Sequence, residues 1–197
     1  MSLILNTNNI MKNKIIYTFL FLTTILSCKA QTISLDQLSQ CENKPDCPDY
    51  IYLKDTNNRL DKFVGVWKGT YTDGRTYEFH FTKKENNYTF GKYWDIIKGR
   101  LLIKTPNGQE LANTLSASDD NTLFGGFIFD KNLIRYQMYY SGNAECNDKG
   151  YVYLSIDPNN INQMKLYFMQ DMDIIASCPN GYKTVIPDAK TLTLTKQ

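Results

Sequence analysis

The sequence is poor in the residues and motifs that usually carry catalysis. It has one histidine, His80, and no Gly-x-Ser-x-Gly, phosphate-binding loop, dinucleotide fingerprint or zinc-binding His-Glu motif. A catalytic histidine needs a nucleophile or second acid within hydrogen-bonding distance, and the sequence marks none. His80 shares a strand face with Thr76, Glu78 and Thr82, which is typical of a solvated strand residue. We therefore predict no catalytic residue, no cofactor and a non-enzymatic protein; an enzyme would need His80 in a cleft beside a carboxylate such as Glu78.

An excess of charge of one sign is also missing. The chain has 22 Lys and Arg against 20 Asp and Glu, a net charge of +2. Lys12 and Lys14 fall in the N-terminal signal described below, so the rest of the chain carries 20 charges of each sign. No basic cluster is longer than Lys83-Lys84. The charge balance therefore gives no argument for a nucleic-acid partner.

Metal ligands are equally scarce. A single histidine and the lack of Cys-x-x-Cys spacing argue against a zinc site. Asp119-Asp120 and Asp171-Met172-Asp173 lack the spaced oxygen ligands of a calcium loop, so we interpret them as acids at turns or strand ends. We predict no metal site.

No apolar run is long enough to cross a bilayer as a helix. The longest, Ile15 to Leu26, follows the short cationic stretch Met11 to Lys14, and this pair of features is typical of a secretory signal. Residues 1–27 are therefore predicted to be a signal peptide. Met11 is the better initiator, because Ser2 to Ile10 adds nothing that a signal requires.

The apolar run closes with Ile25-Leu26-Ser27-Cys28, which resembles the lipobox of bacterial lipoproteins. The resemblance implies cleavage before Cys28 and acylation of its sulfur and new amino group, which would anchor the chain stably. The alternative is an ordinary export signal with an incidental cysteine. The junction through Gln31 resembles small Bacteroidota lipoproteins of uncharacterised families. By that similarity, with no aspartate directly after Cys28, we expect the outer membrane and a domain that faces the periplasm.

The chain after the signal has the length of one domain with a tether, 170 residues. We assign residues 28–33 to a lipidated tether, 34–56 to an N-terminal cap with a short helix and a turn, and 57–197 to the main domain. Ser34 and Gln37 have the spacing of a capping box, which predicts a helix to about Gln40.

Four further cysteines lie in this exported segment, where disulfides are expected. Three pairings are possible. We favour Cys41 with Cys47, because the residues between them favour a turn, and Cys146 with Cys178, because both lie in turn-rich segments. In the loop-entropy model these bonds contribute roughly 2 and 4 kcal/mol.

From Lys68 nearly to the C-terminus, apolar and polar residues alternate with the period of two that marks half-buried strands. Asp73-Gly74 predicts a tight hairpin, and Glu85-Asn86-Asn87 predicts another turn. The expected strands are Lys68–Thr72, Thr76–Thr82, Tyr88–Asp95, Ile96–Lys104, Glu110–Leu115, Leu123–Phe129, Leu133–Tyr140, Tyr151–Ile156, Met164–Gln170, Tyr182–Ile186 and a last one around Leu192 and Leu194.

This pattern predicts an all-β, antiparallel up-and-down meander of about 9–11 strands. A barrel fits best, because so long a meander must close or leave exposed edges; a curved sandwich is the alternative. An outer-membrane barrel is disfavoured, because most strands are shorter than the roughly 9–11 residues needed to span a bilayer.

A short helical turn that feeds Gly65-Val66-Trp67 resembles the opening motif of lipocalins and related ligand-binding barrels. The resemblance implies a lipocalin-like barrel in which Gly65 permits a tight entry and Trp67 plugs the closed end. The chain departs from that family because the last strand offers Lys190 and Lys196, but no arginine, to lie across Trp67. The alternative is a core tryptophan of another β-fold.

Aromatic residues are abundant, with 14 Tyr, 10 Phe and 2 Trp. Tyr136, Met138 and Tyr140 share one face of a predicted strand and are our candidate ligand-binding residues, since buried tyrosine hydroxyls seek partners. Such stripes are also ordinary core packing. We predict a lipid-anchored envelope protein that binds a small hydrophobic or amphipathic ligand inside the barrel. The alternative is an interaction module that docks a partner protein or a glycan through an aromatic surface and has a packed interior.

Overall fold

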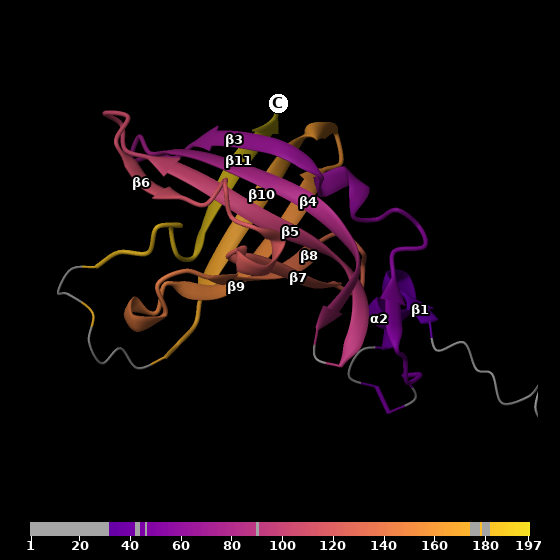
Figure 1. Ribbon diagram of the computed structural model, residues 1–197. Helices are drawn as coiled ribbons and strands as arrows, with labels where there is room; N and C mark the ends of the chain where they lie inside the picture. Colours follow the sequence, from indigo (N-terminus) through magenta and orange to yellow (C-terminus); the bar gives the residue numbers. More distant parts are fainter. Residues whose placement is uncertain (1–31, 42–43, 46, 90, 174–177, 179–181) are drawn as a thin grey trace, which may run out of the picture. The chain divides into compact units, whose positions relative to one another are not determined.

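Eight antiparallel strands close into a ring in the computed structural model of the protein (Figure 1). They are β3 (Gly65–Thr70), β4 (Thr76–Thr89), β5 (Lys92–Lys104), β7 (Phe124–Phe129), β8 (Tyr136–Ser141), β9 (Lys149–Asp157), β10 (Asn160–Gln170) and β11 (Lys190–Lys196). Each strand pairs with the next in the ring, β7 pairs back onto β5, and β11 closes onto β3. The predicted all-β, up-and-down, lipocalin-like barrel is confirmed.

The structure describes residues 32–41, 44–45, 47–89, 91–173, 178 and 182–197, and Thr32–Gln197 forms one unit. The predicted signal peptide, Met11 and Cys28 lie outside the described residues. Within the described residues, no helix combines the length and the apolar character needed to cross a membrane.

Three short strands lie outside the ring. β1 (Thr32–Ser34) pairs in parallel with β2 (Tyr52–Lys54), and β2 pairs in parallel with the start of β5, whereas β6 (Glu110–Asn113) pairs antiparallel with the end of β5. Together with the helix α2 (Leu35–Cys41), β1 and β2 form a cap. β1 takes in Thr32 and Ile33, so it begins inside the predicted tether.

The predicted capping box starts α2. The backbone N–H of Ser34 donates to Gln37 Oε1 at 2.9 Å, and the N–H of Gln37 donates to Ser34 Oγ at 3.0 Å. The two disulfides join Cys41 to Cys47 and Cys146 to Cys178, the pairing favoured from the sequence. They indicate an oxidising compartment, extracellular or periplasmic.

Two strand predictions are wrong. Glu85-Asn86-Asn87 is not a turn, because β4 continues through it to Thr89. A bulge after Lys84 absorbs Asn86 in the left-handed region (φ 54°), and Asp95 Oδ1 accepts the N–H of Asn86 at 2.9 Å in place of a ladder partner. The predicted boundary between two strands at Asp95-Ile96 is also absent, because β5 runs through it without a break.

The segment 182–186 is likewise no strand. Its polar groups bond to side chains instead of to a neighbouring strand: the Val185 carbonyl accepts from Tyr77 Oη at 3.1 Å and from Arg75 Nη1 at 3.0 Å. Ile186 is fully buried in the core. Of the two last strands predicted, only the one around Leu192 and Leu194 is present, as β11.

The barrel interior is filled by large side chains. The inward-facing aromatic residues, each at most 2% exposed, are Trp67, Tyr77, Phe79, Phe81, Phe124, Tyr136, Tyr140 and Phe168. Gly99 permits close packing between two of these rings, because a Cβ there would lie 2.8 Å from both Phe81 and Phe124. These described side chains therefore pack closely against one another inside the barrel.

Gly65 and Trp67 lie where the one-turn helix η1 (Asp61–Phe63) enters β3. Gly65 has a φ of 129°, a conformation that favours glycine. The indole N–H of Trp67 donates to the Phe63 carbonyl at 2.8 Å, and Lys196 Nζ lies 5.3 Å from the centre of the Trp67 ring. Lys196 thus lies across the Trp67 ring, where the lipocalin resemblance implies an arginine.

Candidate functional site

The predicted ligand-binding residues Tyr136, Met138 and Tyr140 all lie on β8 and point into the packed interior. Each is at most 2% exposed. Tyr136 Oη accepts the N–H of Ile97 at 3.3 Å, and the Tyr140 ring packs 4.8 Å from that of Phe124. Burial raises the pKa of both tyrosine hydroxyls, so they stay neutral. A ligand at these residues would have to displace core side chains.

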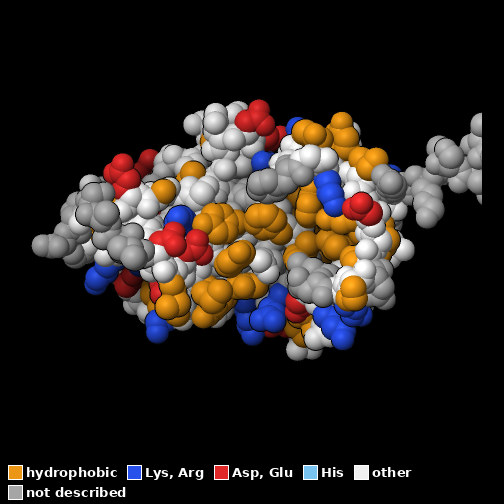
Figure 2. All heavy atoms as spheres, turned by 90° about the horizontal axis from the view of Figure 1, so that it is seen from below, with side chains coloured by type: hydrophobic (Ala, Val, Ile, Leu, Met, Phe, Trp, Pro, Cys, Tyr) orange, Lys and Arg blue, Asp and Glu red, His pale blue; other side chains and the backbone are white. Residues whose placement is uncertain are grey.

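A groove lies instead on the outer wall of the barrel, at the seam with the cap. This seam groove has a volume of about 270 Å³. The cap side contributes Leu38 of α2 and Tyr50, just before β2, while the barrel contributes Trp94, Phe127, Ile128, Gln137 and Tyr151 from β5, β7, β8 and β9. Figure 2 views the outer face that carries β7 to β9 and shows hydrophobic side chains gathered across it and into a hollow.

Aromatic rings dominate the seam groove, and its polar groups are few. The Tyr50 and Trp94 rings meet edge to face at 6.0 Å. The Nε1 of Trp94 is buried and has no hydrogen-bond partner within the described residues. At the rim, Lys92 Nζ lies 3.9 Å from the centre of the Tyr50 ring. An apolar wall with a few donors is the usual composition of a small-molecule site.

An outer tyrosine patch continues from the groove along β8, β9 and β10. Its members pair across the strands with their side chains on the outer face: Tyr139 with Tyr151, Tyr151 with Met169, and Tyr153 with Tyr167. The Tyr139 and Tyr151 rings meet edge to face at 5.5 Å. The hydroxyl of Tyr139 donates to Asp171 Oδ2 at 2.6 Å, and burial, followed by this bond, raises its pKa to about 12.

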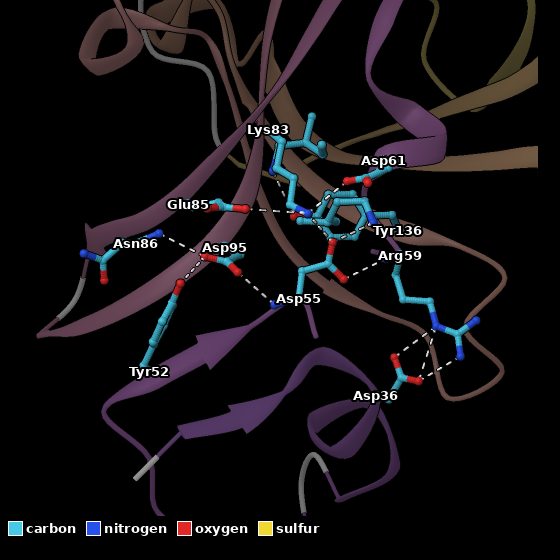
Figure 3. Close-up of polar contacts among 12 residues, drawn as sticks. Asp36, Tyr52, Asp55, Arg59, Asp61, Lys83, Glu85, Asn86, Asp95 and Tyr136 are labelled. Atoms are coloured by element: carbon cyan, nitrogen blue, oxygen red, sulfur yellow. Dashed lines mark hydrogen bonds and ion pairs between the residues drawn. The ribbon is translucent and has the colours of Figure 1, made fainter. Parts of the chain in front are cut away.

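A buried polar cluster at the junction of cap and barrel is centred on Asp55 (Figure 3). One Asp55 oxygen accepts the N–H of Arg59 at 2.7 Å, and the other accepts the N–H of Leu60 at 3.0 Å and lies 2.9 Å from Lys83 Nζ. Lys83 also lies 2.9 Å from Asp61. The Asp55 side chain has no exposed surface, and these contacts compensate its buried charge.

The second buried acid of the cluster, Asp95, links β5 to the cap. Its Oδ1 accepts from Tyr52 Oη at 2.6 Å and from the N–H of Asn86, and its Oδ2 accepts the N–H of Asp55 at 2.9 Å. Burial and then the bond to Asp95 raise the pKa of Tyr52 to about 12. At the cap surface, Arg59 pairs with Asp36 of α2 at 2.8 Å.

Figure 3 shows these side chains converging between the cap strands and the long β4–β5 hairpin. Every polar atom named in the cluster has a partner, so we assign it a structural role. It fixes the cap against the barrel and thereby places Leu38 and Tyr50 opposite Trp94. The polar cluster therefore builds the seam groove without lining it.

His80 lies beside Glu78 on the outer wall of β4, as an enzyme would require. Its Nε2 is 2.6 Å from Glu78 Oε1, and Lys68 Nζ is 2.9 Å from Glu78 Oε2. These bonds, that of Lys68 first, lower the pKa of Glu78. Glu78 and Lys68 border an open hollow of about 470 Å³. Among the described residues, neither His80 nor Glu78 hydrogen-bonds a serine, threonine or cysteine, so we assign the group no reaction.

Asp148, close in sequence to the Cys146–Cys178 disulfide, is a buried acid that, unlike Asp55 and Asp95, is only partly hydrogen-bonded. Its Oδ2 accepts from Tyr182 Oη at 3.0 Å and weakly from Tyr140 Oη at 3.4 Å. Its Oδ1 is buried and has no hydrogen-bond partner among the described residues, and burial raises its pKa. The neighbouring Asn147 Oδ1 is also buried, and the described part of the chain offers it no partner.

Sequence reasoning missed the seam groove. Its residues come from the cap and from four different strands, and no local pattern joins them. The one available signal was Trp94, an aromatic residue that follows Tyr93 and so breaks the period of two where β5 meets the cap. Within the described residues, no group of three or more His, Cys, Asp or Glu is placed to hold a metal ion.

Comparison with known proteins gives one match. A family model described as a family of unknown function (DUF6705) matches residues 11–193. Neither the curated proteins nor the solved structures include a significant match. The family match indicates no enzyme class.

Proposed function

The chain belongs to the DUF6705 family of unknown function, and on that premise we propose that it is a lipid-anchored protein of the bacterial envelope. In this proposal it binds a small hydrophobic or amphipathic ligand in the seam groove, on the outer wall of the barrel.

The observation that carries the proposal is the contrast between a filled interior and an open aromatic groove. Inside, the described aromatic side chains are each at most 2% exposed and pack against one another. Outside, Tyr50, Trp94 and Tyr151 border a hollow of about 270 Å³, close to the lower limit of typical ligand pockets. Such a hollow suits a ligand with a compact ring or a short apolar body.

The cellular address rests on the sequence and the disulfides. The lipobox-like run that ends at Cys28 supports acylation there. The Cys41–Cys47 and Cys146–Cys178 bonds support an oxidising compartment. We place the protein on the outer membrane with the barrel in the periplasm, because no aspartate directly follows Cys28.

Binding of the amphipathic dye anilinonaphthalene sulfonate tests the site. We expect the chain from Cys28 onward to bind the dye with a rise in fluorescence, and Trp94→Ala to weaken binding by about tenfold or more, since a central aromatic anchor contributes about 2 kcal/mol. Native mass spectrometry of protein extracted from its own envelope should show a co-purified small molecule that the Trp94→Ala variant loses.

Met138→Leu is the matched control, because it nearly conserves volume inside the barrel. If the seam groove is the site, this variant binds the dye as the unmodified protein does. Weakened binding in Met138→Leu with normal binding in Trp94→Ala would move the site to the interior and overturn the proposal.

The outer tyrosine patch favours a second candidate function, docking of a partner protein or an envelope glycan. Tyr151, 36% exposed, and Met169, 42% exposed, lie side by side on its surface. A co-purified protein or glycan that is lost from Tyr167→Ala but retained by Trp94→Ala would favour this function over the groove ligand.

A further inference from the structure

The edge of the sheet nearest the predicted anchor carries exposed tyrosines. One row of paired residues crosses four strands there: Thr32 of β1, Tyr52 of β2, Tyr93 of β5 and Tyr88 of β4. The starts of β1, β2 and β5 thus lie together, beside the end of β4. Figure 1 shows the β4–β5 turn and the cap at the same end of the barrel.

The side chains of this edge are among the most exposed large apolar groups described. Tyr88 is 64% exposed, Ile51 52% and Tyr93 38%. The Tyr88 and Tyr93 rings lie 5.0 Å apart, and the Tyr93 N–H donates to the Ile51 carbonyl at 2.8 Å. We call Ile51, Tyr88 and Tyr93 the tyrosine edge; Tyr52 lies in the same row, but its hydroxyl is bonded to Asp95.

The length of the tether places this edge close to a bilayer. Three residues separate Cys28 from Thr32, the first residue of the row. Four Cα–Cα steps span at most about 14 Å, even when the chain is fully extended. If Cys28 is acylated, Thr32 cannot lie farther than this from the headgroups that surround the acyl chains.

We propose that the tyrosine edge docks onto the surface of the membrane that holds the acyl chains, and so orients the barrel. The inference rests on the lipid anchor of the proposed function. Tyrosine suits the membrane–water interface because its ring is apolar and its hydroxyl stays hydrated. Lys54 and Lys92 flank the edge, but so do Asp49 and Glu85, so the contact depends on rings and Ile51, not on net charge.

Docking leaves the seam groove free. Trp94 follows Tyr93 along β5 and points to the opposite face of the strand, into the groove. A docked barrel therefore presents the groove beside the membrane surface, within reach of amphipathic molecules that enter or leave the bilayer.

Depth-dependent fluorescence quenching tests the docking. Tyr88→Trp is introduced into the acylated full-length protein, which is reconstituted into phosphatidylethanolamine–phosphatidylglycerol vesicles whose acyl chains carry bromine close to the headgroups. After subtraction of the emission of the unmodified protein, the new tryptophan should lose about half of its fluorescence, as expected of a ring at the interface. Ile51→Trp is a second probe of the same edge, in case the first variant folds poorly.

Leu111→Trp is the control. Leu111 is 46% exposed on β6, which pairs with the opposite end of β5, about 30 Å from Tyr93 along the strand. Its fluorescence should not change. Vesicle flotation separates the two premises: protein that fails to float overturns the lipid anchor and the docking with it. Floating protein in which residues 51 and 88 are quenched no more than residue 111 overturns the docking alone.

Discussion

The two faces of β8 both carry tyrosine, but the side chains on each face have different surroundings. Tyr136, Met138 and Tyr140 point inward, and none exposes more than 2% of its surface. Gln137 and Tyr139 point outward, where Gln137 borders the seam groove and Tyr139 belongs to the outer tyrosine patch. The inner face packs the core, whereas the outer face keeps aromatic surface open to solvent.

The difference shows where this fold has room for a ligand. A lipocalin-like entry suggests a ligand inside the barrel, but here Phe79, Phe81 and Phe124 occupy that space. In the function proposed above, the ligand binds on the outer wall, where the cap adds Leu38 and Tyr50 to the strand surface. The cap converts an ordinary outer face into a groove.

The largest effect should come from the inner face. Phe79→Ala removes a fully buried ring that contacts Tyr77, Phe81 and Phe124, and we expect a loss of about 3–5 kcal/mol in the free energy of unfolding. Tyr153→Ala on the outer face should cost about 1 kcal/mol or less. Urea denaturation measures both, and equal losses would contradict the distinction between a packed interior and an open exterior.

Buried and exposed groups can also be compared at Lys83, whose ammonium group pairs with the buried Asp55 and the exposed Asp61. Asp55→Asn removes the charge of the buried partner and leaves Lys83 at the junction with two exposed acids, Asp61 at 2.9 Å and Glu85 at 4.0 Å. We expect a loss of about 2–4 kcal/mol, somewhat less than for a fully buried pair because the Lys83 side chain is 15% exposed. Hydrogen exchange should also accelerate in β1, α2 and β2, since the cap loses its main attachment.

Asp61→Asn is the matched variant, because the Asp61 side chain is 57% exposed and bonds the same Nζ at the same distance. Its cost should not exceed about 1 kcal/mol. If the two variants unfold at the same urea concentration, the cluster does not hold the cap and the seam groove does not depend on it.

Much of the fold could be predicted because its signals are local. Period-two alternation survives in β8, β9 and β10, whose inward residues are the buried ones. The Ser34–Gln37 capping box is complete within four residues. In contrast, β1 and β2 have three residues each, too few to show a period, and they pair in parallel through long-range contacts that no local pattern encodes.

The site was harder to predict for the same reason. Leu38 and Tyr151 lie more than a hundred positions apart in the sequence and meet only once the barrel has closed and the cap has docked. The Asn86 bulge shows a related failure, since asparagine accepts a left-handed conformation in a bulge as readily as in a turn. What separates the two outcomes is Asp95, nine residues farther along.

The contributions of two acids to stability, the buried Asp148 and the partly exposed Asp36, should change with pH in opposite directions. Burial raises the pKa of Asp148, so the folded protein retains a proton that the unfolded chain has lost. Stability should fall as pH rises from about 3.8 through the raised pKa. Asp148→Asn should remove this fall and melt at a higher temperature than the unmodified protein at neutral pH.

Asp36 gives the opposing case. The hydrogen bond from Arg59 lowers the pKa of Asp36, so its contribution is present above about 3.8 and is lost as pH falls through the lowered pKa. Asp36→Asn should therefore melt lower than the unmodified protein at neutral pH and approach it in acid. Thermal melts followed by circular dichroism measure both effects. If Asp148→Asn melts below the unmodified protein at neutral pH, burial of the Asp148 carboxylate does not destabilise the folded protein, and the prediction is wrong.

The smallest effect concerns two lysines of β11, one over the core and one in solvent. Lys196 Nζ lies 5.3 Å from the centre of the Trp67 ring, at the closed entry to β3. Lys196→Gln should cost about 0.5–1 kcal/mol, the usual contribution of a cation to an aromatic face. Lys190→Gln, at the exposed start of the same strand, should leave the urea midpoint unchanged. A loss in both variants would point to general charge effects in β11; a loss confined to Lys196→Gln would show that lysine fills the place that a lipocalin-like entry reserves for arginine.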